Sequence, residues 1–281
     1  MNIYPIIVVY NKSIKESKTL MRLKECNVPN ENIIVVDNST LDFGIKEYCE
    51  ITAYKYISMQ GNKGLSKAYN CVLDNLNPMA APDDILIWLD DDTDVTKEYF
   101  DMLRSKSISL KSIDIFAPII IGQDGVIYSP NEGHFFGSKF MKSPDADINM
   151  NKFNGINSCL AVRNRIYDNY RYTEELFMDL TDNQFFDDMR KRNVRFCILR
   201  TCINQSFFQR GDNLDANQLI ARIRIKFKDF MIYANNKGKI YLFAGLIKCV
   251  GWGIVLGMKT KSPKMFFYCC FKGTKEFIRN L

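Results

Sequence analysis

The sequence has almost no histidine, and it lacks the closely spaced cysteine pairs that build zinc and redox sites. Its 281 residues include a single histidine, His134, and its nine cysteines form no Cys-x-x-Cys pair. Nothing in this pattern suggests zinc or dithiol chemistry, and His134 is predicted to be a loop or packing residue. The odd number of cysteines favours buried free thiols in a reducing cytoplasm. The N-terminus also lacks a basic region followed by a long apolar stretch, so no signal peptide is predicted.

Acidic residues are scarce in the last part of the chain. Residues 218–281 hold 13 lysines and arginines but only Asp229 and Glu276, a net charge of +11 that leaves −5 for residues 1–217. An acidic body with a basic tail is not the usual charge distribution of a nucleic-acid binder, so no nucleic-acid partner is predicted. We therefore expect a domain of residues 1–217 and a tail of residues 218–281 that meet different partners.

Short apolar runs alternate with amphipathic segments in the first 90 residues. Strands rich in β-branched residues are predicted at residues 3–10, 33–36, 54–58 and 85–89. Helices are predicted at residues 16–24, 64–76 and 182–192, the last with Asp182 as its N-cap. Alternating strands and helices indicate an α/β fold built around a largely parallel sheet.

Acidic side chains directly follow two of these strands. Asp37 and Asn38 follow the second strand, and Asp90, Asp91 and Asp92 follow the fourth. Ligands of parallel α/β sheets bind beyond the carboxyl ends of the strands, so both clusters are expected at a binding site. Three consecutive carboxylates repel one another, and a hard divalent cation such as Mg²⁺ or Mn²⁺ would neutralise them.

The acidic run has two other interpretations. It could be a solvated loop, which its place at a strand end disfavours. It could also open an EF-hand, since Asp90, Asp92 and Asp94 have the right spacing. Val95, however, occupies the position that requires glycine, and Asp101 stands where the bidentate glutamate belongs, so a calcium loop is excluded.

Four motifs in this order resemble family 2 glycosyltransferases with the GT-A fold. They are residues 6–11 (IIVVYN), 35–39 (VVDNS), the Asn62-x-Gly64 pair with Asn70, and residues 88–92 (WLDDD). Residues 155–158 (GINS) and 174–182 (EELFMDLTD) are similar to the branch of bacterial rhamnosyl- and galactofuranosyl-type transferases. The resemblance covers residues 3–230. It implies an α/β, GT-A nucleotide-diphospho-sugar transferase fold, a Rossmann-like mixed sheet flanked by helices, followed here by a helical, basic tail.

The resemblance implies a role for each matching residue. The residues that would bind a nucleotide-sugar donor of UDP or dTDP type are Tyr10, Asp37, Asn38, Gly64, Asp90 and Asp91. A divalent metal, Mn²⁺ or Mg²⁺, would be held by Asp92 as the best single ligand, together with Asp90 and Gln205. Asp182 would be the catalytic base, because transfer with inversion needs a carboxylate that takes the proton of the acceptor hydroxyl. The metal would neutralise the charge on the nucleoside diphosphate leaving group.

Two positions depart from the family. Many members carry a metal-binding histidine beyond the base, where this chain offers Gln205 or Asn204. An amide oxygen binds a hard cation, but it contributes no charge and binds transition ions poorly. Cys159 stands where relatives of the branch often have glycine, which bears on the shape of the acceptor site.

The tail contains a long apolar stretch. Residues 240–258 hold one charged residue, Lys248. A spanning helix needs about 20 apolar residues, and a central lysine costs roughly 2.5–3.5 kcal/mol on insertion. Lysines interleave with aromatic residues from residue 259 onward, which favours a helix lying in the interface of an anionic membrane over packing alone or spanning. Residues 240–281 would then hold the protein in the cytoplasm, peripherally on the inner face of the plasma membrane.

The sequence therefore predicts a metal-dependent, inverting glycosyltransferase that acts on a glycan or lipid-linked acceptor in bacterial surface polysaccharide synthesis. A non-catalytic or weakened relative that binds nucleotide sugar or glycan stays open, because the metal-binding histidine is missing. A sugar-phosphate nucleotidyltransferase is the other rival. Such enzymes usually have a Gly-rich phosphate loop after the first strand, and residues 11–15 contain no glycine.

Overall fold

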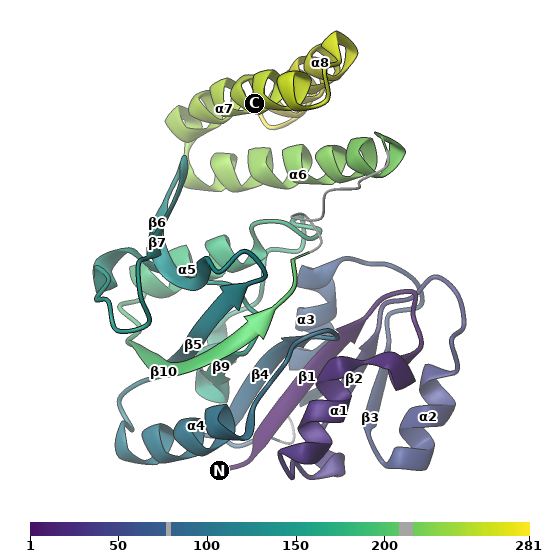
Figure 1. Cartoon of the computed structure of the whole chain (residues 1–281), viewed down its shortest axis with the longest axis vertical. Helices are drawn as coiled ribbons and strands as arrows, with labels where there is room; N and C mark the ends of the chain where they lie inside the picture. Colours follow the sequence, from purple (N-terminus) through teal and green to yellow (C-terminus); the bar gives the residue numbers. More distant parts are fainter. Residues whose placement is uncertain (77–79, 208–215) are drawn as a thin grey trace.

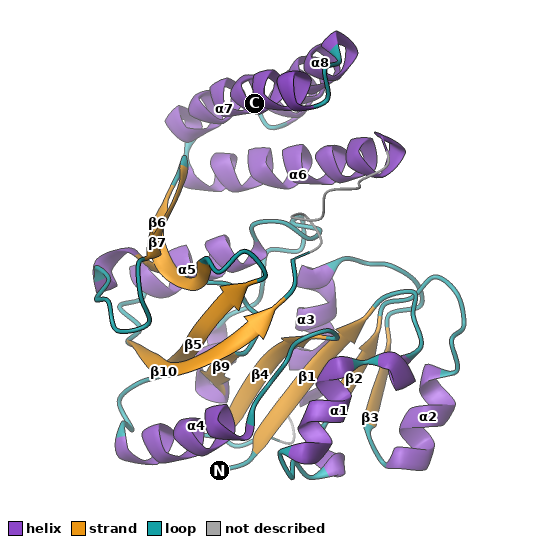
Figure 2. Cartoon of the chain, in the orientation of Figure 1, coloured by secondary structure: helices purple, strands orange, loops and turns teal. Residues whose placement is uncertain are grey.

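The computed structural model describes residues 1–76, 80–207 and 216–281, with side chains from residue 219 onward in the last range. Within these residues, ten strands form one mixed sheet that has helices on both faces (Figures 1 and 2). Three further helices are stacked beyond one end of the sheet domain (Figure 1). The predicted α/β class, with a helical tail, is confirmed.

The strands lie in the order β3-β2-β1-β4-β9-β5-β6-β7, with β10 paired to β5 and β8 to β6. β1, β2, β3 and β4 run parallel, whereas β9 is antiparallel to β4. The strands are β1 (Ile3–Val9), β2 (Ile34–Asp37), β3 (Lys55–Ser58), β4 (Ile85–Asp90), β5 (Ile115–Gly122), β6 (Ile127–His134), β7 (Gly137–Met141), β8 (Phe153–Asn154), β9 (Leu160–Arg163) and β10 (Phe196–Gln205). Each of the four predicted strands is found, with its ends within one residue of the prediction.

The described α-helices are α1 (Lys18–Glu25), α2 (Ile45–Thr52), α3 (Leu65–Leu76), α4 (Lys97–Ser109), α5 (Thr181–Lys191), α6 (Ala216–Lys237), α7 (Lys239–Lys259) and α8 (Pro263–Arg279). α1, α3 and α5 correspond to the three predicted helices. α2 and α4 were not among the predicted helices.

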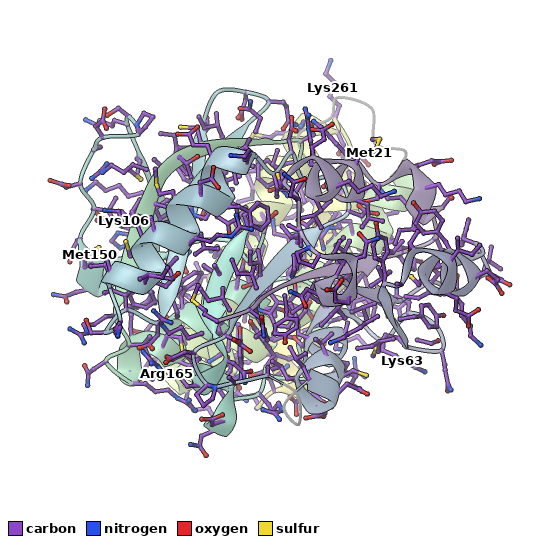
Figure 3. All side chains as sticks on the ribbon, turned by 90° about the horizontal axis from the view of Figure 1, so that it is seen from below. Met21, Lys63, Lys106, Met150, Arg165 and Lys261 are labelled. Carbon is purple, nitrogen blue, oxygen red and sulfur yellow. The ribbon has the colours of Figure 1, made fainter. Side chains whose placement is uncertain are left out.

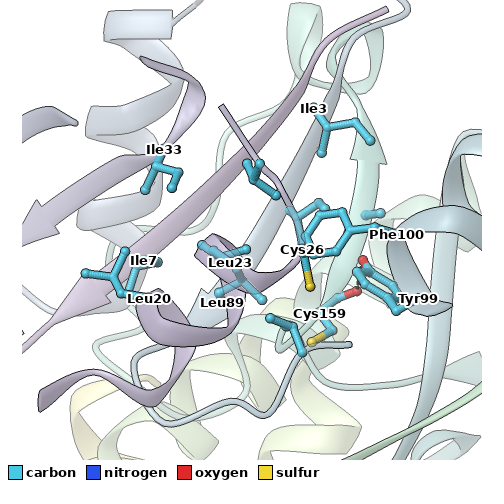
Figure 4. Packing of buried hydrophobic residues seen from close by; sticks show 14 of the residues in the cluster. Ile3, Ile7, Leu20, Leu23, Cys26, Ile33, Leu89, Tyr99, Phe100 and Cys159 are labelled. Carbon is cyan, nitrogen blue, oxygen red and sulfur yellow. Dashed lines mark hydrogen bonds between the residues drawn. The ribbon is translucent and has the colours of Figure 1, made fainter. Parts of the chain in front are cut away.

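The central strands are buried on both faces, and their side chains alternate between two cores. Ile7 of β1 packs with α1, α2 and α4, whereas its neighbour Ile6 packs with α3 and α5. This follows from the two-residue period of a strand. Figure 4 shows part of the first core, including Ile7, Leu20, Leu23, Leu89, Tyr99 and Phe100. The second core is aromatic, and Trp88 Nε1 donates a hydrogen bond to the Tyr167 hydroxyl at 2.7 Å.

The helices α6, α7 and α8 build a third core of their own. The β6–β7 hairpin extends from the sheet to these helices (Figure 1). The ring of Phe135, just beyond β6, lies 5.4 Å from the ring of Phe230 of α6, centroid to centroid, and the Phe135 carbonyl accepts a hydrogen bond from Lys248 of α7 at 2.9 Å. The predicted boundary between residues 1–217 and 218–281 remains a prediction, since residues 208–215 lie outside the described part of the chain.

All nine cysteines are free. Cys26, Cys49, Cys159, Cys249 and Cys269 are buried, as predicted, but Cys202 is exposed. Cys202 belongs to β10, where every second residue points to solvent near the end of the strand. The strand period therefore explains its exposure.

Candidate active site

The carboxyl ends of β1, β2 and β4 lie side by side at one edge of the sheet. Val9 of β1 is level with Asp37 of β2, and Val8 is level with Asp90 of β4. The residues that follow these strands are therefore neighbours, as the alternation of strands and helices predicts. Both acidic clusters lie at this edge.

Asp37 and Tyr10 occupy the ends of β2 and β1. Asp37 is half-buried; its Oδ2 accepts from the Tyr56 hydroxyl at 3.0 Å, and its Oδ1 accepts from the Ser39 N–H at 3.0 Å. These bonds fix the orientation of the carboxylate. The Tyr10 side chain is 48% exposed. An oriented carboxylate near an exposed aromatic ring can recognise the ribose hydroxyls and the base of a nucleotide.

Asn38 and Gly64 shape the loop that leads into α3. Asn38 is buried; its Oδ1 accepts from the Lys63 N–H at 2.8 Å, and its Nδ2 donates to Asn62 Oδ1 at 3.2 Å. Gly64 has φ +88°, and a Cβ atom there would lie 2.5 Å from the carbonyl oxygen of Phe177. The close approach that Gly64 allows is thus to the backbone before α5. Its predicted contact with the donor stays a prediction.

The three aspartates of the acidic run have three different environments. Asp90 is half-buried, and its Oδ2 accepts from Gln205 Nε2 at 2.8 Å. Asp91 pairs with Lys12 Nζ at 2.7 Å, so its predicted contact with the donor would have to replace this ion pair. Asp92 is exposed. Burial raises the pKa of Asp90, and the charge of Asp92 raises it further. A cation bound between Asp90 and Asp92 would therefore stabilise the ionised form of Asp90.

Gln205 reaches Asp90 although 115 residues separate them. Side chains alternate along β10, which turns Gln205 inward and its neighbour Asn204 outward. The structure thus distinguishes between the two amides that the sequence left open. Within the described residues, Gln205 Oε1 is buried and accepts no hydrogen bond, and the same holds for Oδ1 of Asn157. Asn157 adjoins Ser158, whose hydroxyl hydrogen-bonds to Asp90.

A buried acceptor without a partner is costly, and a cation or a ligand donor would satisfy it. The carboxylates of Asp90 and Asp92 and the amide oxygen of Gln205 make an all-oxygen donor set, which suits a hard divalent cation. Among the described residues, no three or more His, Cys, Asp or Glu side chains form a cluster that could hold a metal. The residues present therefore fit a cation that also uses oxygens of its ligand.

Asp182 lies in the first turn of α5, close enough to Asp90 for their charges to interact. Burial raises the pKa of the Asp182 carboxyl to about 6, and the charges of Asp179 and Asp90 add to this rise. The N–H of Asn183 donates to Oδ1 at 2.8 Å and opposes the shift, but burial outweighs it. A carboxylate with a pKa near 6 is ionised at neutral pH and is a stronger base than an ordinary aspartate.

The prediction that Asp182 caps α5 is wrong. The helix begins at Thr181, and its N-cap is Leu180, which has φ 61° and makes no side-chain cap hydrogen bond. The Thr181 hydroxyl is hydrogen-bonded to that of Ser66 in α3 at 3.1 Å. Contacts from other elements, rather than a cap side chain, thus set the start of α5. A capping role no longer explains Asp182.

His134 and Cys159, which were not predicted to be catalytic, both make structural contacts. His134 is exposed at the end of β6, where it pairs with Gly137 across the hairpin, so it is a strand residue rather than a loop or packing residue. Cys159 is buried with φ +59°, and its carbonyl accepts from the Tyr99 hydroxyl at 2.8 Å. A positive φ favours glycine, which accounts for the glycine expected there.

The sequence reasoning missed Asp229 and Arg222 on α6. Asp229 accepts the backbone N–H groups of Phe177, Met178 and Asp179, and Arg222 forms an ion pair with Asp179. These contacts hold the segment that leads to Asp182. The sequence could have pointed to Asp229, because it is one of only two acidic residues in a basic, apolar tail.

The sequence pattern of glycosyl transferase family 2 matches residues 6–171, more than half of the chain. A search of curated proteins finds no match. Among solved structures, the mannosyltransferase PcManGT from Pyrobaculum calidifontis, in complex with GDP-Man and Mn²⁺, has a TM-score of 0.56 and 12% identity. That match covers 98% of this chain and 86% of the mannosyltransferase chain.

Two more solved structures are similar to the chain. TarS 1–349 of S. aureus has a TM-score of 0.53 and 16% identity, over 100% of this chain and 81% of that one. The chain spans 66% of TarS 1–349 in its complex with UDP and 54% of a longer TarS structure. Glucosyl-3-phosphoglycerate synthase from Mycobacterium tuberculosis, in complex with Mn²⁺, UDP-Glc and phosphoglyceric acid, has a TM-score of 0.51 and 9% identity, over 87% and 79% of the two chains. Identities this low show the fold alone, and the predicted GT-A fold is confirmed.

Proposed function

The chain belongs to glycosyl transferase family 2, whose members are nucleotide-sugar-dependent glycosyltransferases, and from this premise we propose that it is a metal-dependent, inverting transferase. The donor is a UDP- or dTDP-sugar, and the acceptor is a glycan or lipid-linked glycan of a bacterial surface polysaccharide. The resemblance of residues 174–182 supports a hexosyl, rhamnosyl or galactofuranosyl group as the sugar. The observation that carries the proposal is the hydrogen bond between Gln205 and Asp90 at the carboxyl edge of the sheet. Asp90 is also close enough to Asp182 for the charges of the two carboxylates to interact.

Asp92, Asp90 and Gln205 are the residues that would hold the divalent cation. Bound there, the cation would neutralise the charge that develops on the diphosphate leaving group. The buried, unpartnered Oε1 of Gln205 supports this assignment. The all-oxygen set suits Mg²⁺ as well as Mn²⁺. The solved complexes of the mannosyltransferase and of the synthase contain Mn²⁺.

Asp182 acts as the general base. It takes the proton of the acceptor hydroxyl while the hydroxyl oxygen attacks the anomeric carbon of the donor. The bond from that carbon to the diphosphate breaks, the nucleoside diphosphate leaves, and the configuration at the anomeric carbon inverts. Tyr10, Asp37 and Asn38 orient the nucleoside, so that the reacting atoms are held in line.

A donor screen tests this function. Nucleoside diphosphate release is measured with UDP-, dTDP- and GDP-sugars, each with Mg²⁺, with Mn²⁺ and with a chelator. We expect metal-dependent release from one donor class. Asp182→Ala should lower the rate by about 10²–10⁴-fold with nucleotide binding retained. The control is Asp101→Ala, which removes an exposed carboxylate paired with Lys97 on α4 and should leave the rate unchanged.

Two results would contradict the proposal. Nucleotide binding without turnover of any donor would favour the non-catalytic relative, which the missing histidine keeps open. Turnover at the wild-type rate in Asp182→Ala would show that Asp182 is not the general base, although the protein would still be a glycosyltransferase.

We also propose that α7 and α8 dock on an anionic membrane surface from the cytoplasmic side. α7 is the one helix among the described residues that is long and apolar enough to cross a membrane. Six of its exposed side chains form an apolar stripe at helical spacing: Ile240, Phe243, Ile247, Ile254, Val255 and Met258. The exposed face of α8 adds Phe267, Phe271 and Ile278. α7 and α8 form the layer farthest from the sheet (Figure 1).

Lysines border this apolar face, which favours anionic lipid as the occupant. Lys259, Lys261 and Lys264 are exposed around the turn between the two helices, and Lys261 extends from the rim of the molecule (Figure 3). Lys248 points the other way: its Nζ lies 4.6 Å from the Phe230 ring, and burial lowers its pKa to about 8. Peripheral docking leaves the contacts of Lys248 intact, whereas a helix that spans the membrane would break them.

Vesicle flotation tests the docking surface. We expect the chain to float with vesicles that contain anionic lipid and to stay behind with neutral ones. Ile247→Asp, at a position 71% exposed, should lower binding at least several-fold. Ile51→Asp, at a position 84% exposed on α2, is the matched control and should have no effect. Equal loss in both variants, absence of binding to anionic vesicles, or resistance of the bound protein to alkaline extraction would contradict peripheral docking.

A further inference from the structure

Residues 173–180 form an irregular segment between Tyr172 and the first turn of α5, where Asp182 lies. The segment contains no helix or strand of its own, so most of its backbone hydrogen bonds must come from elsewhere. Its geometry decides where α5 begins and therefore where the Asp182 carboxylate stands.

One carboxylate on α6 binds three consecutive amides of this segment. Asp229 Oδ1 accepts from the N–H of Phe177 at 3.1 Å, and its Oδ2 accepts from Met178 at 2.8 Å and Asp179 at 2.9 Å. Asp229 is 0% exposed and lies on a helix whose other buried residues, such as Phe230, are mostly apolar. A buried carboxylate is unfavourable unless hydrogen bonds satisfy it. The three amides satisfy it.

Further polar contacts hold the segment on both sides. Arg222, two turns before Asp229 on α6, forms a two-pronged ion pair with Asp179. Planar pairs of this kind fix orientation as well as distance. On the opposite side, the Phe177 carbonyl accepts from the N–H of Leu65, the first residue of α3, at 2.6 Å. The segment is therefore clamped between α6 and α3.

The same helix also binds α5 directly. The Tyr233 hydroxyl donates to Asp187 Oδ2 at 2.7 Å, and Lys237 forms an ion pair with the same carboxylate. Asn236 Nδ2 donates to Gln184 Oε1 at 3.3 Å. α6 thus fixes both the segment before the helix and the helix itself.

We propose that Asp229 is a positioning residue for the base. By binding the amides of residues 177–179 it sets the left-handed Leu180, the start of α5, and the position of Asp182 relative to Asp90. The proposal rests on the proposed function, in which Asp182 removes the acceptor proton. Tyr10, Asp37 and Asp90, at the ends of β1, β2 and β4, make none of these contacts, and only Gly64 among the predicted donor residues lies against the segment. Loss of Asp229 should therefore lower kcat more than it weakens donor binding.

Asp229→Asn tests the proposal, because it keeps the shape of the side chain and replaces an acceptor oxygen with an NH₂ donor that faces an N–H group. We expect kcat to fall at least about tenfold, since small misplacements of a catalytic group cost up to about 10²-fold. The KM for the donor should stay within about twofold of the wild-type value. Amide hydrogen exchange at residues 177–179 should accelerate at least about tenfold.

Glu276→Gln is the matched control. Glu276 is a carboxylate of α8 that is 2% exposed and ion-paired with Lys272, so its loss perturbs the same helical unit without touching the segment. It should lower stability and leave both kcat and the exchange at residues 177–179 unchanged. If Asp229→Asn fails to fold, Arg222→Met serves instead, because it keeps an aliphatic side chain and releases Asp179.

Two outcomes would overturn the positioning role. One is unchanged exchange at residues 177–179 in a folded Asp229→Asn protein. The other is a rise in the donor KM with no fall in kcat. If the wild-type protein transferred no sugar while Asp229→Asn still accelerated exchange there, the anchoring of the segment would stand and the proposed function would fail.

Discussion

Asp182→Asn should slow transfer by about 10²–10⁴-fold and stabilise the fold. Burial raises the pKa of the carboxyl from 3.8 to about 6, so the folded protein holds an ionised carboxylate at neutral pH at a cost. The change in pKa from 3.8 to about 6 corresponds to roughly 3 kcal/mol, and partial exposure of the side chain reduces this to about 1–2 kcal/mol. Asparagine removes the charge and can still accept the Asn183 N–H through its Oδ1.

The sign of the pH dependence follows from proton binding. Between pH 3.8 and about 6 the folded state holds more protons at Asp182 than the unfolded state, so wild-type stability falls as the pH rises through this window. The gain of Asp182→Asn should therefore be complete above about pH 6 and vanish below pH 4. Denaturant unfolding at pH 7.5 and pH 4, with chelator and without nucleotide, measures it.

Asp94→Asn is a control for which the expected change in folding stability has the opposite sign. Hydrogen bonds and charge from Lys18 and Arg22 lower the pKa of Asp94, so its carboxylate stabilises the fold above the unfolded pKa. Its loss should destabilise the protein at pH 7.5, and the difference should shrink as the pH falls through the folded pKa. If Asp182→Asn were no more stable than wild type at pH 7.5, or if its gain were independent of pH, the assignment of a buried base with a raised pKa would be refuted.

Two other substitutions probe the same edge of the sheet. Gly64→Ala should lower the free energy of unfolding by more than the roughly 1–3 kcal/mol of a strained backbone, and should slow transfer, because its Cβ would meet the Phe177 carbonyl. Gly61→Ala, with φ +106° and nothing within 4 Å of its Cβ, should lower the free energy of unfolding by the backbone strain alone. Urea unfolding and rate measurements compare the two variants. Gln205→His should shift the preference from Mg²⁺ toward Mn²⁺, since imidazole suits transition ions, and equal activation constants in the two proteins would argue against Gln205 as a ligand.

The parts of the fold that follow local rules could be predicted from the sequence. The apolar runs and the polar residues after them located the four parallel strands and placed Asp37 and Asp90 at one edge. The position of Gln205 came from the family resemblance, and its contact with Asp90 depends on the pairing of β10 with β5. Strand pairing between distant segments is not visible in a single sequence.

The start of α5 was mispredicted because it depends on contacts distant in sequence. Asp182 has the residue type of an N-cap, and propensity alone favours it there. Asp229 and Arg222, on a helix more than 40 residues later, hold the segment so that Leu180 becomes the cap instead. The helical tail was predicted correctly, but the direction of Lys248 toward Phe135 was not, since hydropathy alone does not distinguish a lysine facing protein from one facing lipid.

A metal titration of turnover tests the central claim most directly. Release of nucleoside diphosphate from the preferred donor is followed against Mn²⁺ or Mg²⁺ concentration in wild type, Asp92→Ala and Asp101→Ala. We predict a saturable dependence on metal in wild type, a loss of at least about 100-fold in Asp92→Ala, and a wild-type curve in Asp101→Ala. Turnover that persists in excess chelator, or an Asp92→Ala protein that matches wild type, would contradict the account of the acidic run as a metal and diphosphate site.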